Sequence, residues 1–165
     1  MVIRLPPAGR PKDYLRIGRS FVEAAWRCFT DQQQLQCDEP ILMYIPICVN
    51  ASFACELLLK GMVHLEGKTV PKTHNLLKLY NLLSDHNKYF LYGVYVDKEH
   101  DKEEAKRRYE ALLSKYSSEF NRTRYSVETP SKASFDVTAL LSMCYNMLIA
   151  VEVAFREQQK AEDQS

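Results

Sequence analysis

Glycine-rich loops, clustered metal ligands and paired cysteines are all missing from this chain of 165 residues. It has only five glycines, and it contains no phosphate-binding glycine loop, no HExxH motif and no G-x-S-x-G motif. The common motif-bearing enzyme classes therefore gain no support. The five cysteines are odd in number and form no CxxC pair: Cys28, Cys37, Cys48, Cys55 and Cys144. This pattern argues against a disulfide framework or a zinc site, so neither a metal nor a cofactor is expected.

An excess of charge of one sign is also lacking, because 22 lysines and arginines face 21 acidic residues, for a formal net charge of +1. No global field draws the chain to nucleic acid or to acidic membranes, so any such binding must be local. The N-terminal segment MVIRLPPAGRPK has no long apolar run, and neither a signal peptide nor a membrane anchor is expected there. Together with the unpaired cysteines, this favours a reducing, cytoplasmic setting and no membrane partner. Buried free thiols are expected where cysteines lie in apolar helical patterns, at Cys28, Cys55 and Cys144.

The strongest pattern that the sequence does contain is a helical hairpin over residues 50–83. In its first half, polar residues recur at every fourth position and apolar residues fill nearly all positions between them; the polar ones are Ser52, Glu56, Lys60 and His64. A helix that is apolar on most of its circumference must be enclosed by other elements, so this is expected to be the central helix of a bundle. Gly67 and Pro71 are typical of its end, and Thr73 is expected to cap the second helix.

Amphipathic patterns predict further helices around this hairpin, over residues 12–34, 98–120 and from Ser131 or Ser134 to 155. The run ILMYIPICV is expected to join the central helix, with Pro46 either kinking it or marking its start. Residues 85–96 are expected to form a short helix and a loop, whereas residues 121–130 break the periodicity. The chain is thus expected to be one all-α domain over residues 1–165, an up-and-down helical bundle of about four long helices plus one or more short ones. An irregular arm over residues 1–11 and a frayed tail over residues 157–165 complete it.

Two candidate site residues, Glu56 and Lys60, stand four apart with the acid on the N-terminal side, the favoured orientation for a helical ion pair. The pair is expected to be structural, but if it is partly buried it can also form the polar floor of a site. His64 is expected to be a structural hydrogen-bond partner one turn from Lys60. His74 stands near the predicted start of the next helix, where capping is favoured over catalysis.

A sharper candidate for binding is the segment with Asn121, Arg122, Arg124 and Tyr125. Two guanidinium groups beside a phenol, at the end of a helix, can hold a phosphate or stack on a base without help from net charge. Alternatively, the arginines neutralise the C-terminal end of that helix and the nearby acidic residues. Both interpretations remain open at this point.

The runs FACELLLKGMVHLEGK and KTHNLLKLYNLL, followed by RYSVE, resemble the HEPN domain, the higher-eukaryote and prokaryote nucleotide-binding domain. The resemblance is to a bacterial branch with the motifs A-C-E-L-x-L-K, H-[DN]-L and R-Y-x-x-E, and it spans about residues 13–155. It implies a bundle of about five helices that is commonly a homodimer. Proteins of this family are linked to RNA cleavage, nucleotide binding, toxin–antitoxin pairs and phage defence.

In the ribonuclease members of that family, an arginine followed roughly four to six residues later by a histidine carries catalysis. No histidine of this chain has an arginine at that distance upstream, and no arginine lies between Arg27 and Arg107. The resemblance therefore implies a non-catalytic module that binds a nucleotide or RNA through a set of six residues: Arg122, Arg124, Tyr125, Lys60, Glu56 and His74. Two alternatives stay open. One is a divergent metal-independent ribonuclease toxin that uses His74 and Arg124 as catalytic residues, and the other is a helical module that binds a partner protein encoded nearby.

Overall fold

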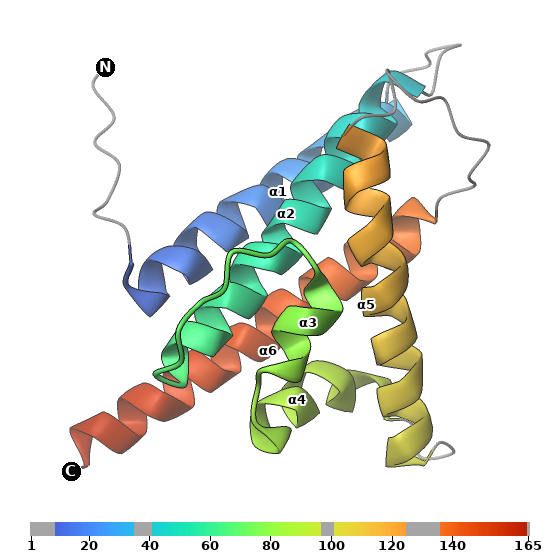
Figure 1. The fold of residues 1–165 in the computed structure, drawn as a ribbon. Coiled ribbons are helices and arrows are strands. Elements are labelled where there is room, and N and C mark those ends of the chain that lie inside the picture. The colour runs from blue at the N-terminus through green and yellow to red at the C-terminus, as the bar shows by residue number, and fades with distance from the viewer. Residues whose placement is uncertain (1–8, 35–40, 97–100, 125–135, 165) are drawn as a thin grey trace, which may run out of the picture.

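The computed structural model describes residues 9–34, 41–96, 101–124 and 136–164, and all regular elements among them are helical (Figure 1). The four long helices are α1 (Pro11–Gln34), α2 (Ile41–Leu65), α5 (Lys102–Arg124) and α6 (Val137–Asp163). The short elements are α3 (Leu76–Asn81), α4 (Asp85–Tyr92) and the 3-10 helix η1 (Gly93–Tyr95). The predicted all-α bundle of four long helices plus short ones is confirmed, as is a short helix within residues 85–96.

Helix α2 lies at the centre of the bundle, where it packs along α1 and against α6, α5 and α3 (Figure 1). Its side chains are buried on most of its circumference, and Leu58, Leu59 and Met62 are each 0% exposed. Glycine permits the close approach of α1, because a Cβ added at Gly61 would lie 3.0 Å from Cβ of Tyr14. The apolar pattern around the polar stripe thus reflects enclosure by neighbouring helices.

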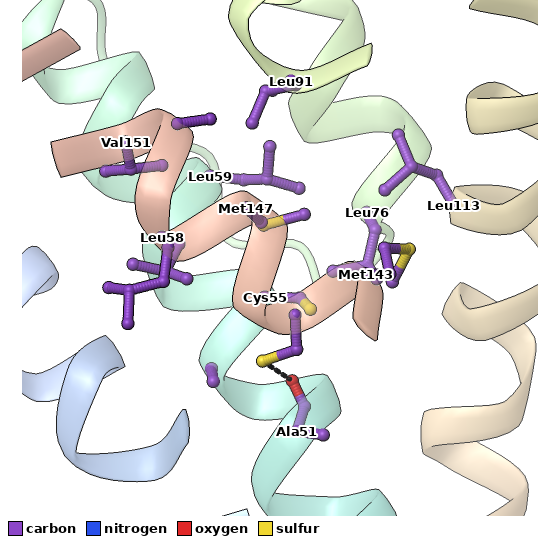
Figure 2. Close-up of a cluster of buried hydrophobic side chains, with 14 of the residues drawn as sticks. Ala51, Cys55, Leu58, Leu59, Leu76, Leu91, Leu113, Met143, Met147 and Val151 are labelled. Atoms are coloured by element: carbon purple, nitrogen blue, oxygen red, sulfur yellow. Dashed lines mark hydrogen bonds between the residues drawn. The ribbon is translucent and has the colours of Figure 1, made fainter. Parts of the chain in front are cut away.

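The core forms where the other helices pack around α2 (Figure 2). Its buried side chains come from all six α-helices and include Leu59, Leu76, Leu91, Leu113, Met143 and Met147. The Cys144 thiol donates to the carbonyl oxygen of Ala51 at 3.5 Å. A hydrogen bond with Cys144 and complete burial raise the pKa of the Cys55 thiol well above its ordinary value. Cys55 is therefore a neutral, unreactive core thiol, as expected from its place in the pattern.

The other described cysteines are Cys28 and Cys48. Cys28 is only half-buried, whereas Cys48 is buried in the core. Cys37 lies outside the described residues. The prediction of a buried thiol is therefore confirmed at Cys55 and Cys144 and is only partly correct at Cys28.

Two helices are long and apolar enough, by length and composition alone, to cross a membrane: Tyr44–Leu65 within α2 and Val137–Ala161 within α6. Of these windows, 61% and 50% respectively are buried inside the bundle. Core packing accounts for that apolar character, since a helix enclosed by others needs few polar positions. The apolarity of these two helices is therefore only weak evidence for a membrane span.

Two helices start at other caps than the sequence suggests. The N-cap of α3 is Asn75 rather than Thr73, since the Asn75 side chain accepts from the Lys78 N–H at 2.8 Å. Helix α6 begins after Asp136, whose carboxylate accepts from the Ala139 N–H at 2.9 Å. The predicted caps at Ser131 and Ser134 fall outside the described residues. Asn, Asp, Ser and Thr all serve well as N-caps, so the sequence offered several equivalent starts.

Two helix ends also lie beyond their predicted positions. Helix α5 continues to Arg124, so residues 121–124 are helical rather than a break. Helix α6 continues past Arg156 to Asp163, where a frayed tail was predicted. That last segment lacks apolar periodicity, but Glu, Gln, Lys and Ala are strong helix formers and extend a helix that packing has already nucleated. At the other end of the chain, Pro11 opens α1, and Pro46 lies inside α2 rather than at its start.

Candidate functional site

The polar stripe of α2 carries a buried acid beside a nearly buried base. Ser52 is 1% and Glu56 3% exposed, which is rare for a carboxylate in the interior of a domain. The Lys60 side chain, one turn further along α2, is 15% exposed. A charge this deep must be compensated by partners, because desolvation without a partner costs several kcal/mol.

The Glu56 carboxylate obtains two partners, one for each oxygen. Its Oε1 lies 2.6 Å from Nζ of Lys60 on the same helix. Its Oε2 lies 2.9 Å from Nδ1 of His74, which belongs to the connection between α2 and α3. One buried carboxylate therefore joins two basic side chains that are fourteen positions apart in the sequence. Both charge partners are held at the edge of the bundle rather than in its core.

His74 does not cap α3, contrary to the prediction from the sequence. The cap is Asn75, and the His74 imidazole instead turns back to α2. The backbone there is fixed from the other side as well, because the Leu76 N–H donates to Oγ of Ser117 on α5 at 2.8 Å. The His74 side chain remains 58% exposed. The loop thus delivers an accessible imidazole to a buried acid.

This arrangement determines which imidazole nitrogen carries a proton. A carboxylate only accepts, so Nδ1 of His74 is the donor to Glu56 and the ring is held in that tautomer. A carboxylate that orients a histidine in this way is found in acid–base catalysis. The same carboxylate also holds the His74 imidazole and the Lys60 ammonium side by side, and two nitrogen donors so placed suit the binding of an anion such as phosphate. The geometry of Glu56, Lys60 and His74 is compatible with either chemistry.

The side chains of the other two residues of the polar stripe, His64 and Ser52, make no hydrogen bond with the Glu56 cluster in the ranges that the structure describes. Nδ1 of His64 is buried and has no hydrogen-bond partner in the described part of the chain. Its ring packs edge-on against Tyr14, with 6.0 Å between the ring centroids. The prediction that His64 is a structural hydrogen-bond partner is therefore wrong, and Lys60, one turn away, pairs with Glu56 instead. The buried Oγ of Ser52 also has no partner within the described residues.

The second predicted cluster lies only partly within the described structure. Arg122 and Arg124 belong to the last turn of α5, but their side chains are outside the description, as is Tyr125 altogether. Helix geometry still places their backbone, because Arg124 follows Ser117 by seven residues, about 10 Å along the helix axis. The hydrogen bond from the Leu76 N–H to Ser117 thus puts the end of α5 within reach of the loop that carries His74.

Sequence reasoning paired Glu56 with Lys60 on one helix, which the structure confirms, but it did not predict the contact of His74 with Glu56. The signal that could have joined Glu56 to His74 was the co-occurrence of the two motifs that contain them, E-L-L-L-K and H-N-L. Among the described residues, no group of three or more His, Cys, Asp or Glu is placed to hold a metal ion.

Comparison with known proteins supports the resemblance to the HEPN family. The family model of the HEPN domain matches residues 12–138, which cover α1 through α5 and the beginning of α6. No curated protein and no solved structure matches the chain.

Proposed function

Because the chain belongs to the HEPN domain family, we propose that it is a non-catalytic HEPN module that binds a nucleotide or RNA. The observation that supports this most directly is the buried Glu56 carboxylate, which holds Lys60 at 2.6 Å and His74 at 2.9 Å. Both basic groups are kept in place without a ligand, so little side-chain entropy is lost when an anion binds. A phosphate group is the anion common to both ligand classes.

The end of α5 supplies further chemistry for such a ligand. In this proposal Arg122 and Arg124 bind phosphate and Tyr125 stacks on a base, while Lys60 and His74 bind a neighbouring phosphate. Guanidinium groups suit phosphate because their donors form a planar fork. The binding role takes precedence over catalysis because the arginine–histidine spacing of HEPN ribonucleases is absent from the sequence.

Equilibrium binding of fluorescently labelled RNA and of labelled mononucleotides tests the proposal. The variant Arg122→Ala plus Arg124→Ala is expected to weaken binding at least tenfold, since each lost phosphate contact removes roughly 1 kcal/mol or more. The matched control is Arg107→Ala plus Arg108→Ala, which removes two exposed arginines from the same helix. Equal affinity of the two double variants, or no binding by the unaltered protein, would sink the proposal.

A second candidate function is metal-independent RNA cleavage, and the pairing of His74 with Glu56 favours it. An imidazole oriented by a carboxylate can transfer protons, and Arg124 would stabilise the phosphate. Incubation with total RNA in the presence of EDTA is the test, with His74→Ala compared with His86→Ala. His86 is a suitable control because it is also exposed and pairs with an acidic residue, Glu157, at 3.6 Å. Cleavage that His74→Ala abolishes and His86→Ala spares would replace the binding proposal.

The proposal also covers the oligomeric state of the protein and the biological system in which it works. We expect a cytoplasmic homodimer that works in a toxin–antitoxin pair or in phage defence, or that binds a partner protein encoded nearby. Light scattering on the purified protein should give twice the 19.2 kDa mass of one chain. A monomeric mass at all concentrations tested would contradict the homodimer.

A further inference from the structure

A second face of the bundle, between α1 and α6, carries two hollows that the site above does not use. The two helices run in opposite directions there (Figure 1). The first hollow, of about 630 Å³, is lined by residues 22–29 of α1 and 138–146 of α6. The second, of about 370 Å³, is lined by residues 12–19 of α1 and 152–159 of α6. The hollows thus follow one another along the same pair of helices, and together they are called the α1/α6 furrow below.

The second hollow is basic. Lys12, Arg16 and Arg19 follow one another by four and three residues, so they share one face of α1, and Arg156 joins them from α6. Glu152 is the one carboxylate among the residues that line it. In a chain with a net charge of +1, this is a local concentration of positive charge. Of these cations only Lys12 lies in the first turn of α1, beside the acidic Asp13, so the cluster is a feature of the helix surface rather than of the helix end.

The carboxylate of the basic hollow orients its arginines without neutralising all of them. Glu152 accepts a hydrogen bond from Arg19 across the two helices and lies 3.7 Å from Arg156. The Arg19 and Arg156 side chains remain 57% and 73% exposed, and each guanidinium has five donors, so donors remain for another anion. Arg16 lies 4.0 Å from Asp13, and Lys12 forms no ion pair within the described part of the chain.

The first hollow is aromatic. Trp26 is 52% and Tyr145 54% exposed, although both are large apolar side chains. Phe29 packs beside Trp26, with 5.8 Å between the ring centroids, and supports it from below the surface. The hollow contains one acidic residue, Glu23. Exposed rings of this kind offer flat faces on which a nucleic-acid base can stack.

We infer that the α1/α6 furrow binds a single-stranded nucleic acid, with phosphates on the basic hollow and a base stacked on Trp26 and Tyr145. Charge complementarity and the adjoining aromatic surface together favour this ligand over a peptide or a membrane. Arg16 and Trp26 are ten residues apart, about 15 Å along α1, which a strand of a few nucleotides spans. The inference rests on the proposed function for the class of ligand only, because the furrow shares no residue with the Glu56 cluster.

The tryptophan provides a direct readout, since Trp26 is the only tryptophan of the chain. Titration of the full chain with an unlabelled twelve-nucleotide oligo-uridylate should quench Trp26 fluorescence saturably. Lys12→Glu plus Arg16→Glu should weaken this binding at least tenfold and reduce its dependence on salt, because fewer counterions are released. The control Arg107→Glu plus Arg108→Glu makes the same change in charge on α5 and should leave quenching unchanged.

A second experiment separates the contribution of the bases to binding from that of the phosphates. An abasic oligonucleotide of the same length carries the phosphates without the bases, so it should bind the basic hollow but leave Trp26 unquenched. In an anisotropy assay with labelled oligo-uridylate, Tyr145→Ala should weaken binding about fivefold or more while its salt dependence stays unchanged. Circular dichroism of each variant checks that the helices are intact.

Defined outcomes overturn the inference. Equal effects of the Lys12/Arg16 reversal and its control would remove the basic hollow as a binding site. A change in oligomeric mass on Tyr145→Ala, without a change in affinity, would make the aromatic hollow an interface between copies of the chain. Binding that depends on Arg122 and Arg124 but not on the furrow would overturn this inference and keep the proposed function. The reverse pattern would keep the furrow and overturn the proposed site.

Discussion

The two sides of this bundle handle charge in opposite ways. Beside α2, one carboxylate at 3% exposure is shared by two basic groups, Lys60 and His74. Between α1 and α6, Glu152 is shared by two arginines that remain mostly exposed. The number of partners is the same, but the burial of the carboxylate differs.

Because the two carboxylates differ in burial, we expect Glu56 to act mainly on folding and Glu152 mainly on the electrostatics of the surface. Glu56 is buried, so removal of one partner leaves a buried charge unpaired, and the same pairing fixes the position of His74. Glu152 is near the surface, where an ion pair contributes little to stability, but its arginines still attract anions. We therefore expect substitutions on the α2 side to change folding, and those on the α1/α6 side to change binding.

The largest expected effect is at Glu56. Glu56→Ala should lower the free energy of unfolding by about 3–5 kcal/mol, because Lys60 is left nearly buried without its acid. Urea denaturation measures this. The control is Glu104→Ala, which breaks an exposed ion pair with Arg108 on α5 and should cost at most about 0.5 kcal/mol. A loss below about 1 kcal/mol at Glu56 would break the contrast between the two sides.

Removal of the corresponding acid on the other side should matter much less for folding. Glu152→Ala is expected to lower the free energy of unfolding by less than about 1 kcal/mol, since Arg19 and Arg156 are solvated. The same change should raise affinity for oligo-uridylate, because it removes negative charge from the basic hollow. A loss of stability as large as that of Glu56→Ala would show that both carboxylates are structural.

Glu66, just after α2, tests an intermediate case. Burial acts to raise the pKa of Glu66, but hydrogen bonds from Lys68, Ser84 and Asn87 outweigh it and lower the pKa below its ordinary value. A lowered pKa stabilises the fold above the unfolded pKa, and this contribution is lost as pH falls through the folded value. Glu66→Gln should therefore flatten the dependence of melting temperature on pH below about pH 5. An unchanged pH profile would mean that these contacts do not persist in solution.

The smallest expected effect is at Tyr109, where a buried polar group has no compensation. Its hydroxyl has no hydrogen-bond partner in the described part of the chain, and burial raises the pKa of Tyr109 well above its ordinary value. Tyr109→Phe should leave the free energy of unfolding unchanged or raise it by up to about 1 kcal/mol. A clear loss of stability in urea denaturation would reveal a partner for this hydroxyl.

Much of the fold could be predicted because α2 is apolar on nearly every face, and a helix with that pattern must be central. The ion pair of Glu56 with Lys60 was also accessible, since a spacing of four fixes neighbours on a helix. The helix starts were less accessible, because Thr73 and Asn75 are both good caps and tertiary contacts decide between them.

The candidate sites depended on contacts that local patterns do not contain. The pair of Glu56 and His74 spans 18 positions, through a loop whose path the sequence does not specify. The pair of Arg19 and Glu152 spans 133 positions and joins helices from opposite ends of the chain. The amphipathic pattern over residues 12–34 predicts the helix that carries Arg16 and Arg19, but nothing near them in the sequence indicates which helix lies opposite.

The central claim is that Glu56 holds His74 and Lys60 in place to bind RNA, and NMR of the histidine side chains tests it most directly. On titration with oligo-uridylate, the imidazole signals of His74 should shift saturably while those of His86, a somewhat more exposed histidine on α4, stay unchanged. In Glu56→Gln the response of His74 should weaken. A His74 signal that does not respond to RNA, or that responds no more than His86, would contradict the account.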